Sequence, residues 1–355
     1  MKNPSSGGSE LYTHEIFSRL AKVFGHHITL FTASFDGAET TEEVGGINIV
    51  RSGGRFSVYR DAKRYYNQHS NEYQVVIDEI NTRPFLTPAF VRDRPIIAII
   101  HQLAREYWWY ETPFPVSAIG YYILEKRWLN NYRDIPTVTV SNSTLNDLKR
   151  LGFTRLTVVP NGLSLHPLQS MPKKSESFTA VFVARMSKVK RPEDAIAAFN
   201  RASLGADAKL FMVGDGQLLS RLSTKYSASS NVLFRGRVSE EEKAHLMREA
   251  HVHLAPYLRE GWGNTVIEAA ALGTPSIGYA TSGLVDSILD GKTGLLVPRF
   301  DVDSLSQKLQ FVKDHPEDRL QLALNGFDWA RQFSWDTSAS KFHALIQEVL
   351  SHSND

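Results

Sequence analysis

The sequence of 355 residues contains no cysteine, which excludes disulfide bonds, thiolate metal sites and a cysteine nucleophile. It also lacks any run of about 18 uncharged apolar residues, the length that a membrane-spanning helix needs. The residues after Met1 are polar, and no apolar stretch follows them as it would in a signal peptide. The absence of cysteine is neutral about compartment, and the other two absences lead us to expect a cytoplasmic enzyme or binding protein.

Neither sign of charge is in large excess. The 40 Lys and Arg residues nearly balance the 38 Asp and Glu residues, which leaves a formal net charge of +2. We therefore expect no nucleic-acid partner, while a modest basic patch that faces a membrane stays open. The composition, 42% hydrophobic and 22% charged, is that of an ordered globular protein, and the length predicts about two domains.

Short apolar runs rich in β-branched residues alternate with helical patterns along the chain. Several runs are apolar without alternation, as strands buried on both faces should be. This pattern predicts a doubly wound α/β architecture with parallel sheets. The expected strands span 28–33, 73–78, 95–101, 137–141, 156–160, 179–184, 209–214, 231–236, 252–256 and 275–279.

Four stretches have the apolar spacing of amphipathic helices. One of them begins with Ser239, a suitable N-cap, and Glu242 follows three residues later as in a capping box. The expected helices span 10–24, 191–202, 239–250 and 333–350, the last capped by Ser334 or Asp336.

A polar segment, HPLQSMPKKSES, separates the two series of strands and contains two prolines. We interpret it as a linker between two Rossmann-like units, with the cleft between them as the default ligand site. The predicted organisation is an amino-terminal domain over 1–165, a linker over 166–178 and a second domain over 179–325.

The beginning of the chain departs from this architecture. In doubly wound folds a strand precedes the first helix and lies centrally in the sheet. Here the first helical pattern starts near Ser9, and the polar MKNPSSGG before it is not expected to form a buried strand. Loss of a central strand would leave apolar surface and unpaired backbone groups. We therefore expect the first strand to be missing, and favour a truncated or misassigned start.

The stretch EGWGNTVIE places seven residues between Glu260 and Glu268. The run that follows its glycines predicts a helix from about Asn264, closed by Gly273. Glycines let the backbone approach a ligand, and the free N–H groups at a helix start suit a phosphate. Carboxylates suit the vicinal hydroxyls of a sugar or ribose. The alternative interpretation is a turn and a helical glutamate that forms a surface salt bridge.

The segment VFVARMSKVKRPEDA carries two cations after an expected strand. Arg185 ends the strand, and Lys190 comes just before a helix that starts at Pro192. Arginine offers a bidentate fork to phosphate and lysine a point charge. By itself such a loop is more often solvated. Together with the acidic stretch it supplies cations for a diphosphate and acids for hydroxyls, at the strand ends where open α/β sheets bind ligands.

Five segments, in this order, resemble the donor-binding half of the retaining glycosyltransferases of family four: ARMSKVKRPEDAI, LFMVGDGQ, VLFRGRVSEEEKAHL, HLAPYLREGWGNTVIEAAALGTPSIGY and SGLVDSILDGKTGLLVP. They cover nearly all of residues 180–298. The first half is similar more loosely, through SSGGSELYTHEI, IIHQ, TVTVSNSTLNDL and VVPNGL. The resemblance implies the GT-B fold, in which two Rossmann-like domains face a cleft. It also implies that a carboxy-terminal helix over 326–355 packs back toward the first domain.

The resemblance implies roles for particular residues. Arg185 and Lys190 would bind the donor diphosphate and stabilise it as the leaving group. Glu260 would contact the hydroxyls of the transferred sugar, and Glu268 those of the ribose. The implied catalytic residues are His101, Arg185, Lys190 and Glu260. The implied donor-binding residues are Gly7 and Gly8 near the phosphates, Gly214 at a glycine turn, Arg237 and Val238 beside the base, Gly261, Trp262, Gly263, Asn264 and Thr265 beside sugar and phosphate, and Glu268.

The function that the resemblance implies is a retaining, metal-independent hexosyltransferase. The donor would be a UDP- or GDP-linked sugar, and the acceptor a hydroxyl of a saccharide or lipid-linked molecule in cell-envelope polysaccharide or glycoconjugate assembly. We expect no cofactor beyond the nucleotide sugar and no metal site. Two alternatives stay open: a nucleotide-sugar epimerase or hydrolase on the same fold, and a non-catalytic nucleotide-sugar-binding protein. We expect a cytoplasmic location, and a peripheral contact with the inner face of the membrane stays open. The sequence does not indicate whether the protein forms oligomers.

Overall fold

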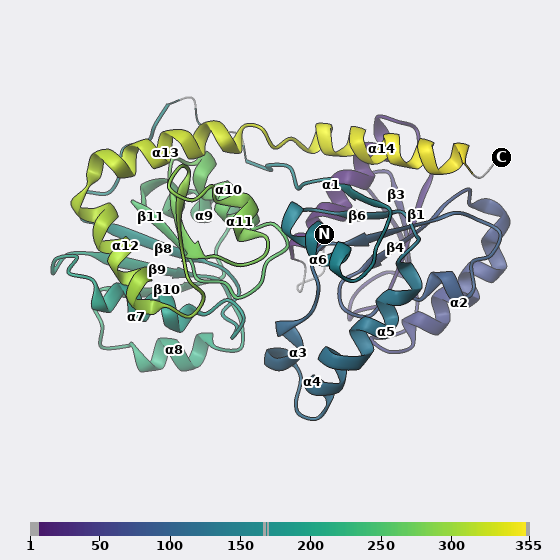
Figure 1. Cartoon of the computed structure of the whole chain (residues 1–355), viewed down its shortest axis with the longest axis horizontal. Coiled ribbons are helices and arrows are strands. Elements are labelled where there is room, and N and C mark those ends of the chain that lie inside the picture. Colours follow the sequence, from purple (N-terminus) through teal and green to yellow (C-terminus); the bar gives the residue numbers. More distant parts are fainter. Residues whose placement is uncertain (1–6, 166–167, 169, 353–355) are drawn as a thin grey trace. The chain divides into compact units, whose positions relative to one another are not determined.

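The computed structural model describes residues 7–165, 168 and 170–352 of the chain. The chain forms two compact units (Figure 1). Unit 1 comprises Met1–Ala104, Ile119–Gly162 and Ser334–Asp355, and unit 2 comprises Arg105–Ala118 and Leu163–Phe333. The segment Arg105–Ala118, which we expected in the first domain, thus groups with unit 2.

Unit 2 is built on a six-stranded sheet in which all neighbouring strands are parallel. Its strand β8 (Thr179–Val183) is buried at every position, as expected for a strand covered on both faces. Ala180 and Phe182 belong to one core, and Val181 and Val183 to the other. The strand order is β10 (Val232–Gly236), β9 (Lys209–Val213), β8, β11 (Val252–Ala255), β12 (Ser276–Tyr279) and β13 (Gly294–Val297).

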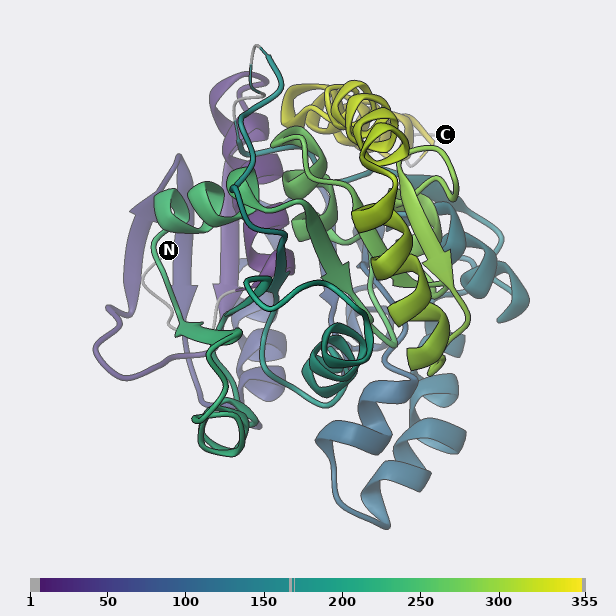
Figure 2. The same cartoon turned by 90° about the vertical axis from the view of Figure 1, so that its left-hand side faces the viewer.

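Helices cover both faces of this sheet (Figures 1 and 2). The helix α9 begins as the sequence predicts, because the Ser239 hydroxyl accepts a hydrogen bond from the Glu242 N–H at 3.1 Å. The helix α10 begins at Asn264, also as predicted. The helices that lie in this unit or reach its boundary are α3 (Glu106–Glu111), α4 (Val116–Ile119), α7 (Pro192–Arg201), α8 (Leu219–Lys225), α9 (Glu240–Glu249), α10 (Asn264–Ala271), α11 (Leu284–Ser287), α12 (Val302–Asp314) and α13 (Pro316–Ala330).

Unit 1 contains two separate sheets. In the first, β1 (Ile28–Thr32) pairs in parallel with β3 (Ile47–Arg51), which forms an antiparallel hairpin with β2 (Thr41–Val44). The second sheet is fully parallel, in the order β4 (Val76–Ile80), β5 (Ile96–Ile100), β6 (Thr137–Thr139) and β7 (Leu156–Val158). The first described element is α1, and the expectation about a strand ahead of it concerns residues that lie outside the described ranges.

The helices of unit 1 include the first and the last of the chain. α1 (Gly8–Lys22) packs beside α14 (Trp335–Ser351), which is drawn in yellow in Figure 1. Phe17 meets Phe342 edge-on at a centroid distance of 5.4 Å, and Arg19 Nε donates to Asp336 at 2.6 Å. The other helical elements are α2 (Val58–His69), η1 (Ser70–Glu72), η2 (Thr87–Ala89), η3 (Gly120–Leu124), α5 (Glu125–Leu129), η4 (Asn130–Tyr132) and α6 (Asn142–Arg150).

The ten expected strands are all present, within three residues at either end. The hairpin β2–β3 and the strand β13 were not expected. β2 reads TEEV, which is too polar to be recognised as a strand, and β13 is four residues long and begins with glycine. In the described ranges no helix combines the length and the apolarity that crossing a bilayer requires.

Candidate functional site

The clearest cluster of expected site residues lies in unit 2, at the carboxyl ends of the neighbouring strands β8 and β11. The loop after β8 carries Arg185 and Lys190, and the loop after β11 carries Glu260. Lys190 forms an ion pair with Glu260, and its Nζ lies 4.4 Å from the ring centroid of Tyr257. The structure thus joins two of the expected catalytic residues directly.

The charge of Lys190 is fixed by these neighbours. Burial lowers the pKa of Lys190, but the Glu260 carboxylate and the hydroxyls of Tyr107 and Tyr257 outweigh burial and raise the pKa well above its usual value. The ammonium therefore stays protonated at neutral pH. An anion that reaches this loop meets a protonated lysine that is already paired with the Glu260 carboxylate.

Arg185 lies on the surface of the same loop, with an exposed side chain. The backbone beside it is packed tightly against the loop after β9. A Cβ at Gly214 would lie 2.1 Å from the Ala184 carbonyl oxygen, and Gly214 has a φ of +128°. Only glycine fits there, at the position where the resemblance implies a glycine turn.

Glu260 and the start of α10 are fixed by two further glycines. Gly263 has a φ of +93° and caps α10, so the chain turns sharply between Trp262 and Asn264. A Cβ at Gly283 would lie 2.4 Å from the Glu260 carbonyl oxygen. The loops that follow β11 and β12 therefore touch through backbone at the residue that holds Lys190.

Trp262 turns its side chain inward. It is 7% exposed, and its ring meets Phe333 edge-on at a centroid distance of 4.8 Å. Gly261 and Gly263 on either side are buried, while Asn264 and Thr265 are half-buried. What this loop offers a ligand is therefore backbone N–H groups at the start of α10 and the side chains of Asn264 and Thr265, and not the indole.

Glu268 is 8% exposed, one turn inside α10. Its Oε2 lies 3.0 Å from Nζ of Lys243 on α9. Burial raises the pKa of Glu268, and the nearby Lys243 ammonium partly opposes this. The sequence analysis missed Lys243, although its place one turn after the Ser239 cap was a usable signal.

Arg237 and Val238 follow β10 at the same edge of the sheet. Arg237 is exposed, while Val238 packs against the core that contains Leu246 and Met247. Of the two, Arg237 is the side chain that a ligand at this edge would reach.

A second group that the sequence did not predict anchors α3 beside this cluster. Glu106 accepts contacts from two arginines, with Arg259 Nε at 3.0 Å and Arg299 Nη1 at 2.8 Å. Arg259 directly precedes Glu260, and Tyr107 directly follows Glu106. The segment Arg105–Ala118 thus contributes to the surroundings of Lys190.

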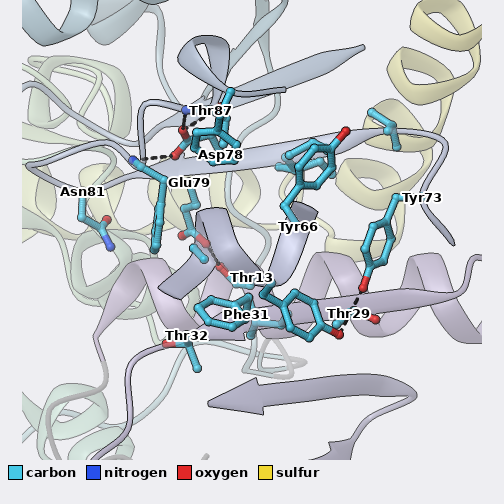
Figure 3. Close-up of a pocket in the computed structure, with 18 of the residues that line it drawn as sticks. Thr13, Thr29, Phe31, Thr32, Tyr66, Tyr73, Asp78, Glu79, Asn81 and Thr87 are labelled. Carbon is cyan, nitrogen blue, oxygen red and sulfur yellow. Dashed lines mark hydrogen bonds between the residues drawn. The ribbon is translucent and has the colours of Figure 1, made fainter. Parts of the chain in front are cut away.

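The remaining expected residues lie in unit 1. His101 follows β5, and its Nε2 is 2.9 Å from Glu79 Oε1. The other oxygen of Glu79 accepts a hydrogen bond from the Thr13 hydroxyl at 2.6 Å (Figure 3). The ring of Tyr12 meets His101 edge-on at 5.0 Å. His101 is therefore held from two sides, by a carboxylate and by an aromatic ring.

Gly7 and Gly8 lie where α1 begins. The Gly7 N–H donates to the Glu10 carboxylate at 2.8 Å, and Gly8 is the first helical residue. No group of three or more His, Cys, Asp or Glu side chains in the described part of the chain is arranged to hold a metal ion.

Two family models match consecutive parts of the chain. The model described as Glycosyltransferase Family 4 matches residues 6–166, and the model described as Glycosyl transferases group 1 matches residues 168–329. Two Rossmann-like units whose sheets are mainly parallel, together with these matches, define a glycosyltransferase of the GT-B class. The chain belongs to the group 1 glycosyltransferases of the family-four type.

Individual proteins match this chain either over a short segment or at low sequence identity. The chain is 33% identical to the D-inositol 3-phosphate glycosyltransferase of Streptomyces scabiei over 122 residues, 34% of this chain and only 27% of that protein. Its fold is similar to sucrose-phosphate synthase of Thermosynechococcus elongatus, with a TM-score of 0.79, 19% identity, and coverage of 98% and 95% of the two chains. Anabaena HepE in complex with UDP-glucose gives a TM-score of 0.74 at 16% identity, with 98% of each chain covered.

Proposed function

We propose that this protein is a retaining hexosyltransferase that moves a sugar from a nucleotide diphosphate to an acceptor hydroxyl. The observation that carries the proposal is the contact between Lys190 and Glu260 at the ends of β8 and β11, beside the start of α10. The Streptomyces relative is a glycosyltransferase and HepE binds UDP-glucose, which supports a UDP-linked donor, with GDP as the other base to test.

In this proposal Arg185 and Lys190 bind the diphosphate. When the bond from the anomeric carbon to the phosphate oxygen breaks, negative charge develops on the leaving diphosphate. Fixed cations stabilise that charge without reorganisation. Because Glu260 keeps Lys190 charged and in place, the cation is positioned before the donor arrives.

In this proposal the two carboxylates of the site accept hydrogen bonds from hydroxyl groups of the donor. Glu260 accepts from the transferred sugar and Glu268 from the ribose, because a carboxylate can accept from both members of a vicinal pair. The backbone of residues 261–265 faces sugar and phosphate at the positive end of α10. Gly214 leaves room at the phosphates, and Arg237 and Val238 border the base.

His101 contacts the reacting sugar in this proposal. Because Glu79 accepts from Nε2, the neutral ring carries its proton there and presents the lone pair of Nδ1. Gly7 and Gly8 have no side chains, so that their backbone can lie close to the phosphates. Thr13, on the same helix as Gly8, fixes Glu79 and so links the start of α1 to His101.

The acceptor oxygen attacks the anomeric carbon on the face that the phosphate leaves, and the departing phosphate oxygen takes its proton. Configuration is retained without a protein nucleophile. We further propose that the side-chain cations do the work of a metal and that no cofactor takes part. The acceptor would be a saccharide or lipid-linked molecule of the cell envelope, with the protein in the cytoplasm and in peripheral contact with the membrane.

The test uses purified protein with UDP-, GDP- and ADP-sugars. Nucleotide release is recorded with and without cell-envelope acceptors and with and without a chelator, and the anomeric configuration of the product is read by NMR. We expect acceptor-dependent release that Glu268→Ala abolishes, and product with the donor's configuration. The control Glu240→Gln alters only the exposed partner of Lys243 and keeps activity.

Other results would select the alternatives. Conversion of the donor without an acceptor would identify an epimerase or hydrolase on this fold. Thermal stabilisation by a nucleotide sugar without turnover would identify a binding protein. An inverted product would refute retention while leaving the transferase.

A further inference from the structure

A cavity of about 420 Å³ lies at the amino-terminal edge of the four-stranded parallel sheet of unit 1. It is lined by Ile96 at the start of β5, Pro136 just before β6, Arg155 just before β7 and His352 after α14. His101 follows the opposite end of β5, and no residue that we assign to the donor or to the reaction lines this cavity. The cavity is therefore a different place in unit 1 from the surroundings of His101.

Three arginines line the cavity and converge on it from two segments of the chain. Arg92 and Arg94 lie in the loop before β5, and Arg155 directly precedes β7. Among the described residues no carboxylate forms an ion pair with Arg92 or Arg155, whereas Arg94 lies 3.8 Å from Asp93. Two of these three cations thus have no acidic partner in the part of the chain that the structure describes.

Asp134 is the single acid among the described residues that line the cavity. Its carboxylate accepts a hydrogen bond from the Thr154 hydroxyl at 3.5 Å, and it forms no ion pair with the three arginines. The described lining therefore places three positive charges against one negative charge, although the net charge of the whole chain is only +2. Like charges in one cavity repel one another, and a bound anion replaces this repulsion by attraction.

Backbone carbonyls hold two of the arginines without neutralising them. Arg94 donates from Nε to the Tyr73 carbonyl at 2.6 Å and from Nη1 to the Asp93 carbonyl at 2.7 Å. Arg92 donates from Nη2 to the Ala89 carbonyl at 3.4 Å. A guanidinium has five N–H groups, so each arginine keeps donors for a ligand. The cations are therefore positioned before an anion arrives.

The floor of the cavity is apolar and contains three prolines. Pro88, Pro95 and Pro136 line it together with the buried side chains of Val91 and Ile96. The proline ring fixes φ and removes the backbone N–H, so these positions form a stiff wall without donors. The floor therefore suits a carbon skeleton, and the arginines suit an anionic group that the skeleton carries.

The number of arginines favours phosphate over carboxylate as that group. Guanidinium groups bind both anions through paired N–H donors. A carboxylate carries one charge on two oxygens, whereas a phosphate monoester carries about −1.5 to −2 at pH 7 and offers three oxygens. Three arginines around one cavity match the charge and the acceptors of the monoester.

We propose that this cavity is a binding site for a phosphate monoester, with the phosphate between Arg92, Arg94 and Arg155 and the carbon skeleton on the apolar floor. Two sources offer this chemistry, a phosphorylated small molecule in solution and the phosphomonoester headgroup of a lipid. The inference concerns unit 1 alone and does not rest on the proposed sugar transfer.

The test follows binding to the purified full chain by isothermal titration calorimetry in a phosphate-free buffer. The probes are glycerol 3-phosphate, inorganic phosphate and glycerol. We expect glycerol 3-phosphate to bind more tightly than inorganic phosphate, and glycerol not to bind. Arg155→Gln should weaken the binding of glycerol 3-phosphate about tenfold, which corresponds to the loss of one charge-assisted hydrogen bond.

Arg150→Gln is the matched control. Arg150 is an exposed arginine of the same unit that already pairs with Asp147 at 3.3 Å, so this variant should bind like the wild type. The side chain of Arg155 is also exposed. Both variants should therefore keep the unfolding temperature of the wild type, which separates a loss of binding from a loss of folding.

Vesicles distinguish the two sources of the phosphate. Sedimentation with phosphatidylcholine vesicles is compared with and without phosphatidic acid, whose headgroup is a phosphate monoester. Capture by phosphatidic acid that Arg155→Gln removes would assign a lipid headgroup, and binding of glycerol 3-phosphate without capture would assign a free ligand. Equal binding by wild type and Arg155→Gln, or no binding in either assay, would overturn the proposal. Inorganic phosphate that binds as tightly as glycerol 3-phosphate would indicate an adventitious ion only and would also overturn it.

Discussion

Glu268 and Lys243 meet inside unit 2, with Oε2 and Nζ 3.0 Å apart and both side chains largely buried. Lys243 compensates a carboxylate that burial would otherwise drive toward its neutral form. Lys243 therefore favours the ionised form of Glu268, which accepts hydrogen bonds from ribose hydroxyls, against the burial that raises the pKa of this carboxyl overall. Lys243 is thus a positioning residue for the proposed donor site.

Replacing Lys243 by methionine should destabilise the protein. Loss of one partner of a buried ion pair costs about 3–5 kcal/mol, and the partly exposed position favours the lower end. Because the pKa of Glu268 would rise further, the loss should be larger at pH 8 than at pH 5. Urea unfolding at both values measures it. Glu240→Gln removes the exposed partner of Lys243 and should change stability little; an equal effect of both variants would contradict the assignment.

Lys190→Met should weaken sugar transfer. One charge-assisted contact to the leaving diphosphate contributes about 1.5–3 kcal/mol, so kcat/KM should fall by roughly tenfold to a hundredfold. The matched control is Lys188→Met, an exposed lysine of the same loop, which should retain activity. Steady-state nucleotide release measures both. Equal activity in the two variants would show that Lys190 is not the diphosphate cation.

Lys174 should make the stability of unit 2 depend on pH. Its Nζ donates to the Arg248 carbonyl at 3.0 Å and to the Thr274 hydroxyl at 2.8 Å. Burial, and then the charge of Arg319, lower the pKa of Lys174 to about 7. Since the pKa of an unfolded lysine is about 10.4, the unfolded chain binds more protons than the folded chain between pH 7 and this value, and stability rises with pH there.

Lys174→Met removes that titration. The free energy of unfolding of the wild type minus that of the variant should therefore increase as pH rises from 7 toward 10. Denaturant unfolding at three pH values measures this difference. Lys173→Met, which changes the exposed neighbour, should give a difference that stays flat over the same range. A flat difference for Lys174→Met as well would exclude the proposed titration.

Gly283→Ala should disturb the loop that holds Glu260. The new Cβ would lie 2.4 Å from the Glu260 carbonyl oxygen, at a φ of +83°. Gly291 has a φ of +69° and open space around its Cβ position, so Gly291→Ala pays the backbone strain alone, about 1 kcal/mol. We expect Gly283→Ala to lower the unfolding temperature more and to lower transfer activity, whereas Gly291→Ala should keep activity. The opposite ranking would contradict the close contact.

The hydrophobic pattern predicted most of the fold because the parallel strands are buried on both faces. β5 reads IIAII and β8 reads TAVFV, and such runs have few alternative conformations in a packed protein. The sequence did not indicate β2 because Glu42 and Glu43 are charged. In the structure Glu43 is exposed, Glu42 forms an ion pair with the buried Arg51, and the register comes from the turn at Gly45–Gly46. Local sequence does not specify such pairing.

The sequence indicated site residues that lie within a recognisable motif, but not the residues that contact them. Arg185, Lys190, Glu260 and Glu268 could be singled out from their own segments, but their partners could not. Lys190 and Glu260 are 70 residues apart. The contacts of Lys243 and Glu106 likewise depend on how α9 and α3 pack, which no short pattern records. The inward turn of Trp262 depends on Phe333 in the same way.

The division of the chain has a consequence for synthesis on the ribosome. Unit 2 is complete once Phe333 has emerged, whereas unit 1 needs Ser334 and the residues of α14 that follow. Until then Phe17 lacks Phe342, and Tyr12 lacks Trp335, which it meets edge-on at 5.9 Å. The unit that is begun first is therefore finished last, and a nascent chain would carry an open apolar face on α1 for most of its translation.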